Sequence, residues 1–152
     1  MGDVSARPKL GSTTYGSARV SPQRLAIAEA VEASAHRTFS ADDIAREVRR
    51  RSPKIGLATV YRAMAAMQSA GSIEGVGERD GAIVYARCGQ KAHHHHVVCT
   101  SCGAVEDVDC PIDVDAAASL GGFLVTGHSL VLRGLCAGCQ QEQMRTCGLQ
   151  DA

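Results

Sequence analysis

Regular patterns of apolar and polar residues begin about 20 residues into the chain, and the first two patterns predict helices. Ser21-Pro22 supplies an N-cap and a proline at the first helical position, so a helix is expected to run to about Ser34. Its core-facing stripe is expected to consist of Leu25, Ala28 and Val31, supported by Ile27. A second helix is predicted to begin at Ser40, in a capping box with Asp43, and to end in the basic cluster at residues 49–51.

A third helix, expected from about Leu57 to Gly71, has two faces of different character. The core-facing positions are predicted to be Leu57, Val60, Met64 and Met67. The opposite face is predicted to carry Ala58, Tyr61, Arg62, Ala65 and Ser69. An outward Tyr–Arg pair among small neighbours suits entry into a DNA major groove, although an ordinary solvated helix face gives the same pattern.

Two strand-like runs at 72–77 and 82–87 follow this helix, and Asp80-Gly81 between them predicts a tight hairpin. Three helices followed by a hairpin form the arrangement of a winged helix-turn-helix. The first half of the chain is therefore interpreted as a DNA-binding domain.

The second half predicts a smaller α/β unit. Its expected strands are 95–98, 104–108, 123–126 and 128–135, with a short helix at 113–120. The predicted fold class is α+β, with an N-terminal winged helix-turn-helix domain and a small α/β dimerisation domain. The predicted limits are a loose arm at 1–18, the first domain at 19–87 and the second at 88–152.

The formal net charge of zero conceals a division of charge between the two halves. Residues 1–87 hold 13 basic against 9 acidic residues, a net charge of +4, whereas residues 88–152 hold 3 against 7, a net charge of −4. All seven cysteines and five of the six histidines also lie in the second half. A basic half suits phosphate, and an acidic half rich in histidine and cysteine suits metal cations.

The chain shows neither a secretory segment at its start nor an apolar run near the ~18 residues that cross a membrane. A cytoplasmic protein without a membrane partner is therefore expected. In that compartment, paired C-x-x-C motifs favour metal over disulfides, and the odd number of cysteines points the same way.

The strongest chemical signal is a pair of C-x-x-C motifs, which supply four thiolates for a closed, tetrahedral, structural zinc site. The predicted ligands are Cys99, Cys102, Cys136 and Cys139. The 33 residues between the pairs exceed the spacing of a simple zinc ribbon, so the site is expected to tie the last strand to the first. A thioredoxin-like redox site is the alternative, but it leaves the second pair unexplained.

Four consecutive histidines precede the first of these pairs, and strand alternation places His93 and His95 on one face and His94 and His96 on the other. The run is therefore predicted to serve two metal sites. The first, between the domains, is expected to consist of Glu74, Cys88, His94 and His96. The second, in the dimerisation domain, is expected to consist of His93, His95, His128 and Asp113, with Asp107 as the alternative carboxylate. No ligand role is assigned to Cys110 or Cys147.

Several motifs together resemble the ferric uptake regulator family of metal-dependent bacterial repressors, over about residues 19–140. "RVSPQRLAIAEAV" resembles the family's first long helix, and "PKIGLATVYRAMAAMQSAGSIE" resembles its recognition helix and wing entry. "HHHHVVCTSCGAVEDVD" and the closing "CAGC" resemble its dimerisation domain. The resemblance implies a structural zinc held by four cysteines, an inter-domain sensing site, and a homodimer that binds a palindromic operator when metal-loaded.

The sensing ligands favour the zinc branch of this family. Iron-type members usually carry a histidine at the position that is Thr38 here, whereas "YARC" before the histidine run is similar to zinc uptake regulators. Those regulators use a wing carboxylate, this cysteine and two histidines, with Asp more usual than the Glu found here. "EDVDCP" also resembles iron- and peroxide-type members, but a soft thiolate ligand disfavours an Fe2+ peroxide sensor.

A metal-responsive, zinc-sensing repressor is thus the leading prediction, with Fe2+ or Mn2+ as alternatives at the regulatory sites. Its expected contacts to double-stranded DNA are Thr59, Tyr61, Arg62, Arg19 and Arg24, with residues 49–51 on phosphates. An iron-responsive repressor or a thiol peroxide sensor acting through Cys88 or Cys110 is the alternative within this class. A zinc hydrolase or deaminase is disfavoured because the chain lacks HExxH and a glutamate beside the histidine run.

Overall fold

The computed structural model describes residues 21–89, 93–110, 119–120 and 123–148. The predicted arm at 1–18 lies outside these residues, and the predicted limits of 19–87 and 88–152 stay a prediction. The chain forms two compact units, Met1–Lys91 and Ala92–Ala152, which are described separately. No helix among the described residues has the length and apolar character needed to cross a membrane.

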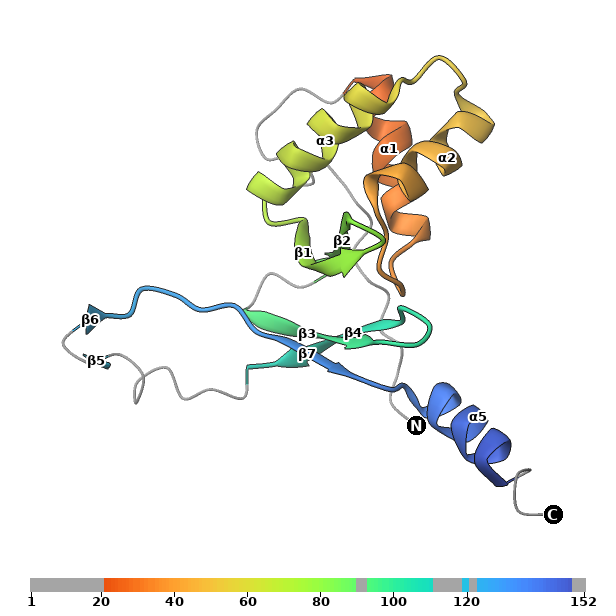
Figure 1. Cartoon of the computed structure of the whole chain (residues 1–152). Coiled ribbons are helices and arrows are strands. Elements are labelled where there is room, and N and C mark those ends of the chain that lie inside the picture. The colour runs from red at the N-terminus through yellow and green to blue at the C-terminus, as the bar shows by residue number, and fades with distance from the viewer. Residues whose placement is uncertain (1–20, 90–92, 111–118, 121–122, 149–152) are drawn as a thin grey trace. The chain divides into compact units, whose positions relative to one another are not determined.

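Three helices form the body of the first unit: α1 (Pro22–Ala33), α2 (Ala41–Arg51) and α3 (Leu57–Ser69) (Figure 1). The predicted start signals are confirmed. Ser21 caps α1 by accepting a hydrogen bond from the Arg24 N–H, and Ser40 and Asp43 form the expected reciprocal capping box of α2. α3 ends where Gly71 takes a φ of +70°, a conformation that favours glycine.

The helices pack around one apolar core, to which Phe39, just before α2, and Ile73, at the start of β1, also belong. On α3 the predicted division of faces is confirmed, because Val60, Met64 and Met67 are buried while the opposite face is exposed. The predicted stripe of α1 is wrong at Leu25, which is 48% exposed. The buried face centres on Ile27 and Val31, and Leu25 lies about 200° around the helix axis from Ile27.

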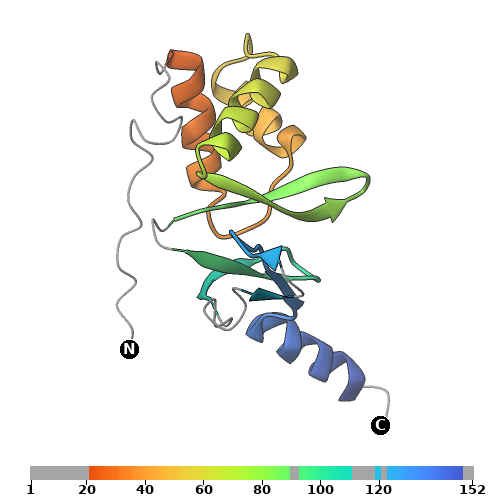
Figure 2. The same ribbon diagram turned by 90° about the vertical axis from the view of Figure 1, so that its left-hand side faces the viewer.

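The wing is the antiparallel pair β1 (Ile73–Arg79) and β2 (Ala82–Arg87), as the Asp-Gly signal predicted (Figure 2). Asp80 and Gly81 both have positive φ, +53° and +76°, as a two-residue hairpin turn requires. Two contacts fasten the wing to the helices: Tyr85 exchanges backbone hydrogen bonds with Phe39, and the buried Arg87 guanidinium lies 2.7 Å from the Glu32 carboxylate.

The second unit is built on a three-stranded sheet in the order β4-β3-β7. β3 (His94–Cys99) pairs antiparallel with β4 (Val105–Asp109) and parallel with β7 (Val131–Gly134). A two-stranded ribbon, β5 (Ser119–Leu120) and β6 (Phe123–Leu124), and the helix α5 (Ala137–Gly148) complete the described part. The α+β fold class is confirmed.

Several predicted elements of the second unit are wrong in detail. The strands expected at 123–126 and 128–135 are limited to residues 123–124 and 131–134. Of the helix expected at 113–120, only Ser119 and Leu120 are described, and they pair as a strand with Phe123–Leu124. α5 was not predicted, because its sequence is mostly polar and lacks an apolar stripe.

Candidate metal centres and DNA-contact face

The four cysteines of the two C-x-x-C motifs lie together in the second unit, with their sulfur atoms all within 4.8 Å of one another. Cys99 is the last residue of β3, and Cys102 lies in the turn that follows. Cys136 lies between β7 and α5, and Cys139 lies in the first turn of α5. Since Cys99 pairs with Gly134 in the parallel ladder, the cluster joins the ends of two neighbouring strands. The Sγ atoms of Cys102 and Cys136 are 3.7 Å apart, close to the ~3.75 Å edge of a tetrahedron with Zn–S bonds of ~2.3 Å.

Hydrogen bonds and sulfur contacts within this cluster shift the pKa values of two of its thiols in opposite directions. Cys136 N–H donates to the Cys99 sulfur at 3.4 Å. Hydrogen bonds from the backbone of Cys102, and then of Cys136, outweigh burial and lower the pKa of Cys99 to about 6. The pKa of Cys139 shifts in the other direction. A hydrogen bond with Ser101 lowers it, but the neighbouring sulfurs of Cys136 and Cys102 outweigh that effect and raise the pKa of Cys139 to about 12. Four crowded sulfurs can all ionise only around a cation, as a thiolate zinc site requires.

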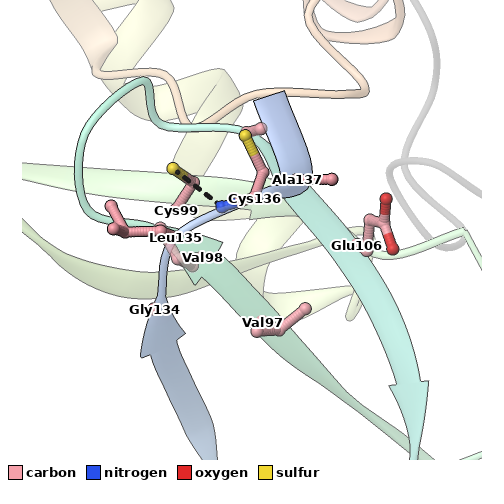
Figure 3. Close-up of a pocket in the computed structure, with 9 residues that line it drawn as sticks. Val97, Val98, Cys99, Glu106, Gly134, Leu135, Cys136 and Ala137 are labelled. Atoms are coloured by element: carbon pink, nitrogen blue, oxygen red, sulfur yellow. Dashed lines mark hydrogen bonds between the residues drawn. The ribbon is translucent and has the colours of Figure 1, made fainter. Parts of the chain in front are cut away.

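A pocket of about 300 Å³ adjoins the cysteine cluster (Figure 3). Its lining includes Val97, Val98 and Leu135 beside the thiols Cys99 and Cys136. The figure shows the hydrogen bond from the Cys136 nitrogen to the Cys99 sulfur at one side of this pocket. Most of this lining is apolar, and the apolar shell around a metal site influences solvent access and the local dielectric.

A second cluster lies at the other end of β3 and contains three of the predicted ligands. The Nε2 atoms of His93, His95 and His128 are 3.0–3.1 Å from one another. Cys110, for which the sequence predicts no ligand role, lies with them: its sulfur is 3.1 Å from the Nε2 atom of His128. Asp113 lies outside the described residues.

His94 and His96 face the other side of β3, as alternation predicted, with ring centroids 5.1 Å apart. His96 is fully buried, and its Nδ1 atom is 3.2 Å from the carboxylate of Asp107, the residue directly opposite on β4. Asp107, the alternative carboxylate for the His93–His95 site, is therefore placed on the face of His94 and His96. The sequence analysis did not predict that Asp107 pairs with His96, although the short connection between the two strands limits the possible registers.

The two remaining predicted sensing residues belong to the first unit. Glu74 lies on β1 opposite Ala86, and the Cys88 N–H donates to the Ser72 carbonyl at 2.9 Å. Since residues 72 and 74 share one strand face, as do 86 and 88, Glu74 and Cys88 lie on the same face of the hairpin. Both side chains are half-buried.

The exposed face of α3 is the candidate DNA interface. Tyr61 is 50% exposed, and Arg62 is exposed beside Thr59, whose hydroxyl lies 3.4 Å from the guanidinium. Arg24 is half-buried at the start of α1, and Arg19 lies outside the described residues. In the 49–51 cluster, Arg50 and Arg51 both approach Glu47, at 2.9 and 3.8 Å.

Comparisons with known proteins place this chain in one family, but its relatives are named for different metals. The model of the ferric uptake regulator family matches residues 16–133. A ferric uptake regulation protein of Neisseria meningitidis serogroup A is 32% identical over 130 residues, which cover 84% of this chain and 90% of that protein. A zinc uptake regulation protein of Mycobacterium tuberculosis is 38% identical over 104 residues, which cover 66% of this chain and 79% of that protein.

Among solved structures, a zinc uptake regulator complexed with zinc and DNA aligns with a TM-score of 0.67 at 25% identity. The alignment covers 85% of this chain and 88% of that one. Proteins named as ferric uptake regulators and proteins named as zinc uptake regulators thus both align with most of this chain. The identity of the metal therefore has to be inferred from the chemistry of the ligands.

Proposed function

This chain belongs to the ferric uptake regulator family of metal-responsive transcriptional regulators, and we propose that it is a zinc-responsive repressor that binds palindromic operator DNA as a metal-loaded homodimer. The observation that carries the zinc assignment is the chemistry of the sensing ligands. One thiolate, two imidazoles and one carboxylate form a mixed set that suits tetrahedral zinc.

We assign these sensing ligands to Cys88, His94, His96 and Glu74. Two features support the assignment: His94 and His96 share one face of β3, and Glu74 and Cys88 share one face of the wing hairpin. These ligands come from both compact units. A cation that binds all four would favour one arrangement of the two units over others, and so would couple metal binding to DNA binding.

The four-cysteine cluster is proposed to hold a structural zinc, because closed thiolate sites bind zinc tightly and contribute folding energy. Its position at the ends of β3 and β7 supports a role in fixing α5 to the sheet. The third cluster, around His93, His95 and His128, is proposed to hold a further divalent cation within the same unit.

DNA binding is proposed to use the exposed face of α3, with Tyr61 and Arg62 toward the bases or phosphates and Thr59 beside them. Arg24 and the cluster at 49–51 are proposed to contact phosphates, and Arg19 is proposed to do so from outside the described residues. Phosphate contacts of this kind make binding dependent on salt.

An iron-responsive repressor is the second candidate, and one observation favours it. Asp107 places a hard carboxylate 3.2 Å from His96, and an oxygen ligand there would suit Fe2+ or Mn2+. The soft Cys88 thiol opposes this assignment, so the two candidates differ in whether Cys88 is needed.

Operator binding should therefore be titrated with Zn2+, Fe2+ and Mn2+ under reducing conditions, with a palindromic duplex selected from a randomised pool. We expect Zn2+ to promote binding at the lowest free concentration. Cys88→Ser should abolish the zinc response while it retains the structural zinc, and Cys147→Ser serves as the matched cysteine control. A Cys88→Ser protein that responds to Fe2+ like the wild type would instead identify an iron-type sensor.

A further inference from the structure

We propose that Cys110 supplies the fourth ligand of the His93–His95–His128 cluster, so that this site is a three-histidine, one-thiolate centre selective for zinc-like cations. The inference deepens the proposed function and rests on it only in that the chain binds divalent metal. It assigns a ligand that the cysteine motifs do not contain, and it replaces the carboxylate expected from the sequence.

Strand register explains why Cys110 is in reach. His95 is paired with Val108 and His94 with Asp109, so one further step of the same antiparallel ladder places His93 opposite Cys110. Residues directly opposite in such a ladder point to the same face of the sheet. His93, His95 and Cys110 therefore share one face, and His128 reaches it from the segment that precedes β7.

Protons alone do not account for the histidine triangle. Each Nε2 atom of a neutral imidazole is either a donor with one N–H or an acceptor with one lone pair. With three nitrogens and only two roles, at least two of them share a role, and the contact between those two is repulsive rather than a hydrogen bond. All three contacts are nevertheless 3.0–3.1 Å. A central cation removes the conflict, because all three nitrogens can then direct lone pairs to it.

The dimensions of the triangle also suit a cation. The centre of a triangle with sides of about 3.0 Å lies about 1.75 Å from each corner. A metal at the usual Zn–N distance of about 2.0–2.1 Å would therefore lie about 1 Å from that plane. This geometry leaves a fourth tetrahedral position, and the Cys110 sulfur, 3.1 Å from the Nε2 atom of His128, is the described group available to fill it.

The fourth ligand decides which metal binds best. A carboxylate in that position would suit Mn2+ and Fe2+, whereas a thiolate favours borderline cations such as Zn2+ and Co2+. Asp107 is not a competitor, because it lies opposite His96 on the other face of the sheet. Asp113 is outside the described residues and is therefore tested directly.

Cobalt spectroscopy of the full-length chain tests the inference, because Co2+ bound to a thiolate absorbs strongly in the near ultraviolet and Co2+ bound to histidine and carboxylate does not. The protein should carry Cys88→Ser and should have its four-cysteine site filled with zinc, so that Cys110 is the remaining assigned thiolate ligand. We expect one equivalent of Co2+ to produce the charge-transfer band. Adding Cys110→Ser should abolish the band and weaken Co2+ binding by more than the roughly 10- to 100-fold cost of losing an outer-shell partner.

Three further variants separate the outcomes. Cys147→Ser should leave the band unchanged, and Asp113→Asn should leave both band and affinity unchanged. Cys110→Asp should bind one cation but shift the preference from Co2+ toward Mn2+. A band that survives Cys110→Ser, or an affinity lost only with Asp113→Asn, would overturn the assignment. Operator binding that ignores zinc would instead defeat the proposed function, and it would leave the cobalt result intact.

Discussion

His96 and Asp107 face each other across two paired strands, with 3.2 Å between the Nδ1 atom of the buried imidazole and the carboxylate oxygen. A carboxylate in this position holds an imidazole in one orientation, and when Nδ1–H donates to it the Nε2 lone pair is left for a metal. The direct cross-strand pairing means that this partner is set by the register of the sheet rather than by a flexible loop.

Asp107→Ala should lower the zinc affinity of the sensing site by roughly 10- to 100-fold, the usual cost of losing an outer-shell partner of a metal-bound histidine. The measurement is a competitive zinc titration against a fluorescent chelator, on protein whose four-cysteine site is filled. Glu106→Ala is the matched control, since Glu106 is an exposed carboxylate on the same strand and its partner Val97 lies on the opposite face from His96. Equal affinities for the two variants would exclude a role for Asp107 in positioning His96.

Arg62→Ala should weaken operator binding and reduce its salt dependence. Each phosphate contact contributes about 0.9 to the slope of log K against log salt concentration, so the loss of one contact should lower the slope by about that amount. Arg145→Ala, which removes an exposed arginine of α5, should leave the slope unchanged. If Arg62 reads a base instead, affinity will fall for the selected operator and not for unrelated DNA.

The capping box of α2 should make stability depend on pH. Burial raises the pKa of Asp43, but hydrogen bonds from Ser40 and the charges of Arg79 and Arg46 outweigh burial, and the pKa is lowered. The stabilisation is therefore fully present above the ordinary value of about 3.9 and is lost as the pH falls through the lower folded-state value. Asp43→Asn should cost about 1 kcal/mol at pH 7, comparable to the loss of a helix cap.

Two measurements check this prediction. The carboxyl carbon of Asp43 should titrate below its ordinary range by NMR. The difference in unfolding free energy between wild type and Asp43→Asn should shrink only at acid pH; metal loss at low pH affects both proteins and cancels in the difference. A constant difference across the whole range would show that the charge of Asp43 does not contribute.

The helical unit could be predicted closely because its signals are local. N-caps at Ser21 and Ser40, the turn at Asp80-Gly81 and the spacing along α3 each depend on a few neighbouring residues. The error at Leu25 arose because the buried face of α1 is chosen by its contacts with other helices. Tertiary packing decides which face is buried, and the spacing of apolar residues along one helix does not fix that face by itself.

The metal clusters were predictable where a motif or strand alternation marks the ligands, and ligands were missed where only the pairing of two strands brings them together. Strand alternation was enough to divide the histidine run into two faces. The positions of Asp107 and Cys110 depend on the register between β3 and β4, which no residue in either strand reveals alone. Counting back from the turn after Cys99 would have suggested the register, since a short connection leaves few alternatives.

Cys102→Ser should remove one tightly bound zinc from each chain and loosen the sheet where the cysteine cluster joins β3 to α5. In the wild type, one zinc should survive mild chelation, because a closed thiolate site holds its metal strongly. Hydrogen exchange should report the local change: the Thr100 N–H donates to the Gly134 carbonyl at 2.8 Å, and its protection should be lost in the variant. Amides in the core of α3 belong to the other compact unit and should keep their protection.

Cys147→Ser is the matched control and should retain both the zinc and the protection. A Cys102→Ser protein with unchanged zinc content and unchanged protection at Thr100 would show that the cluster holds no structural zinc.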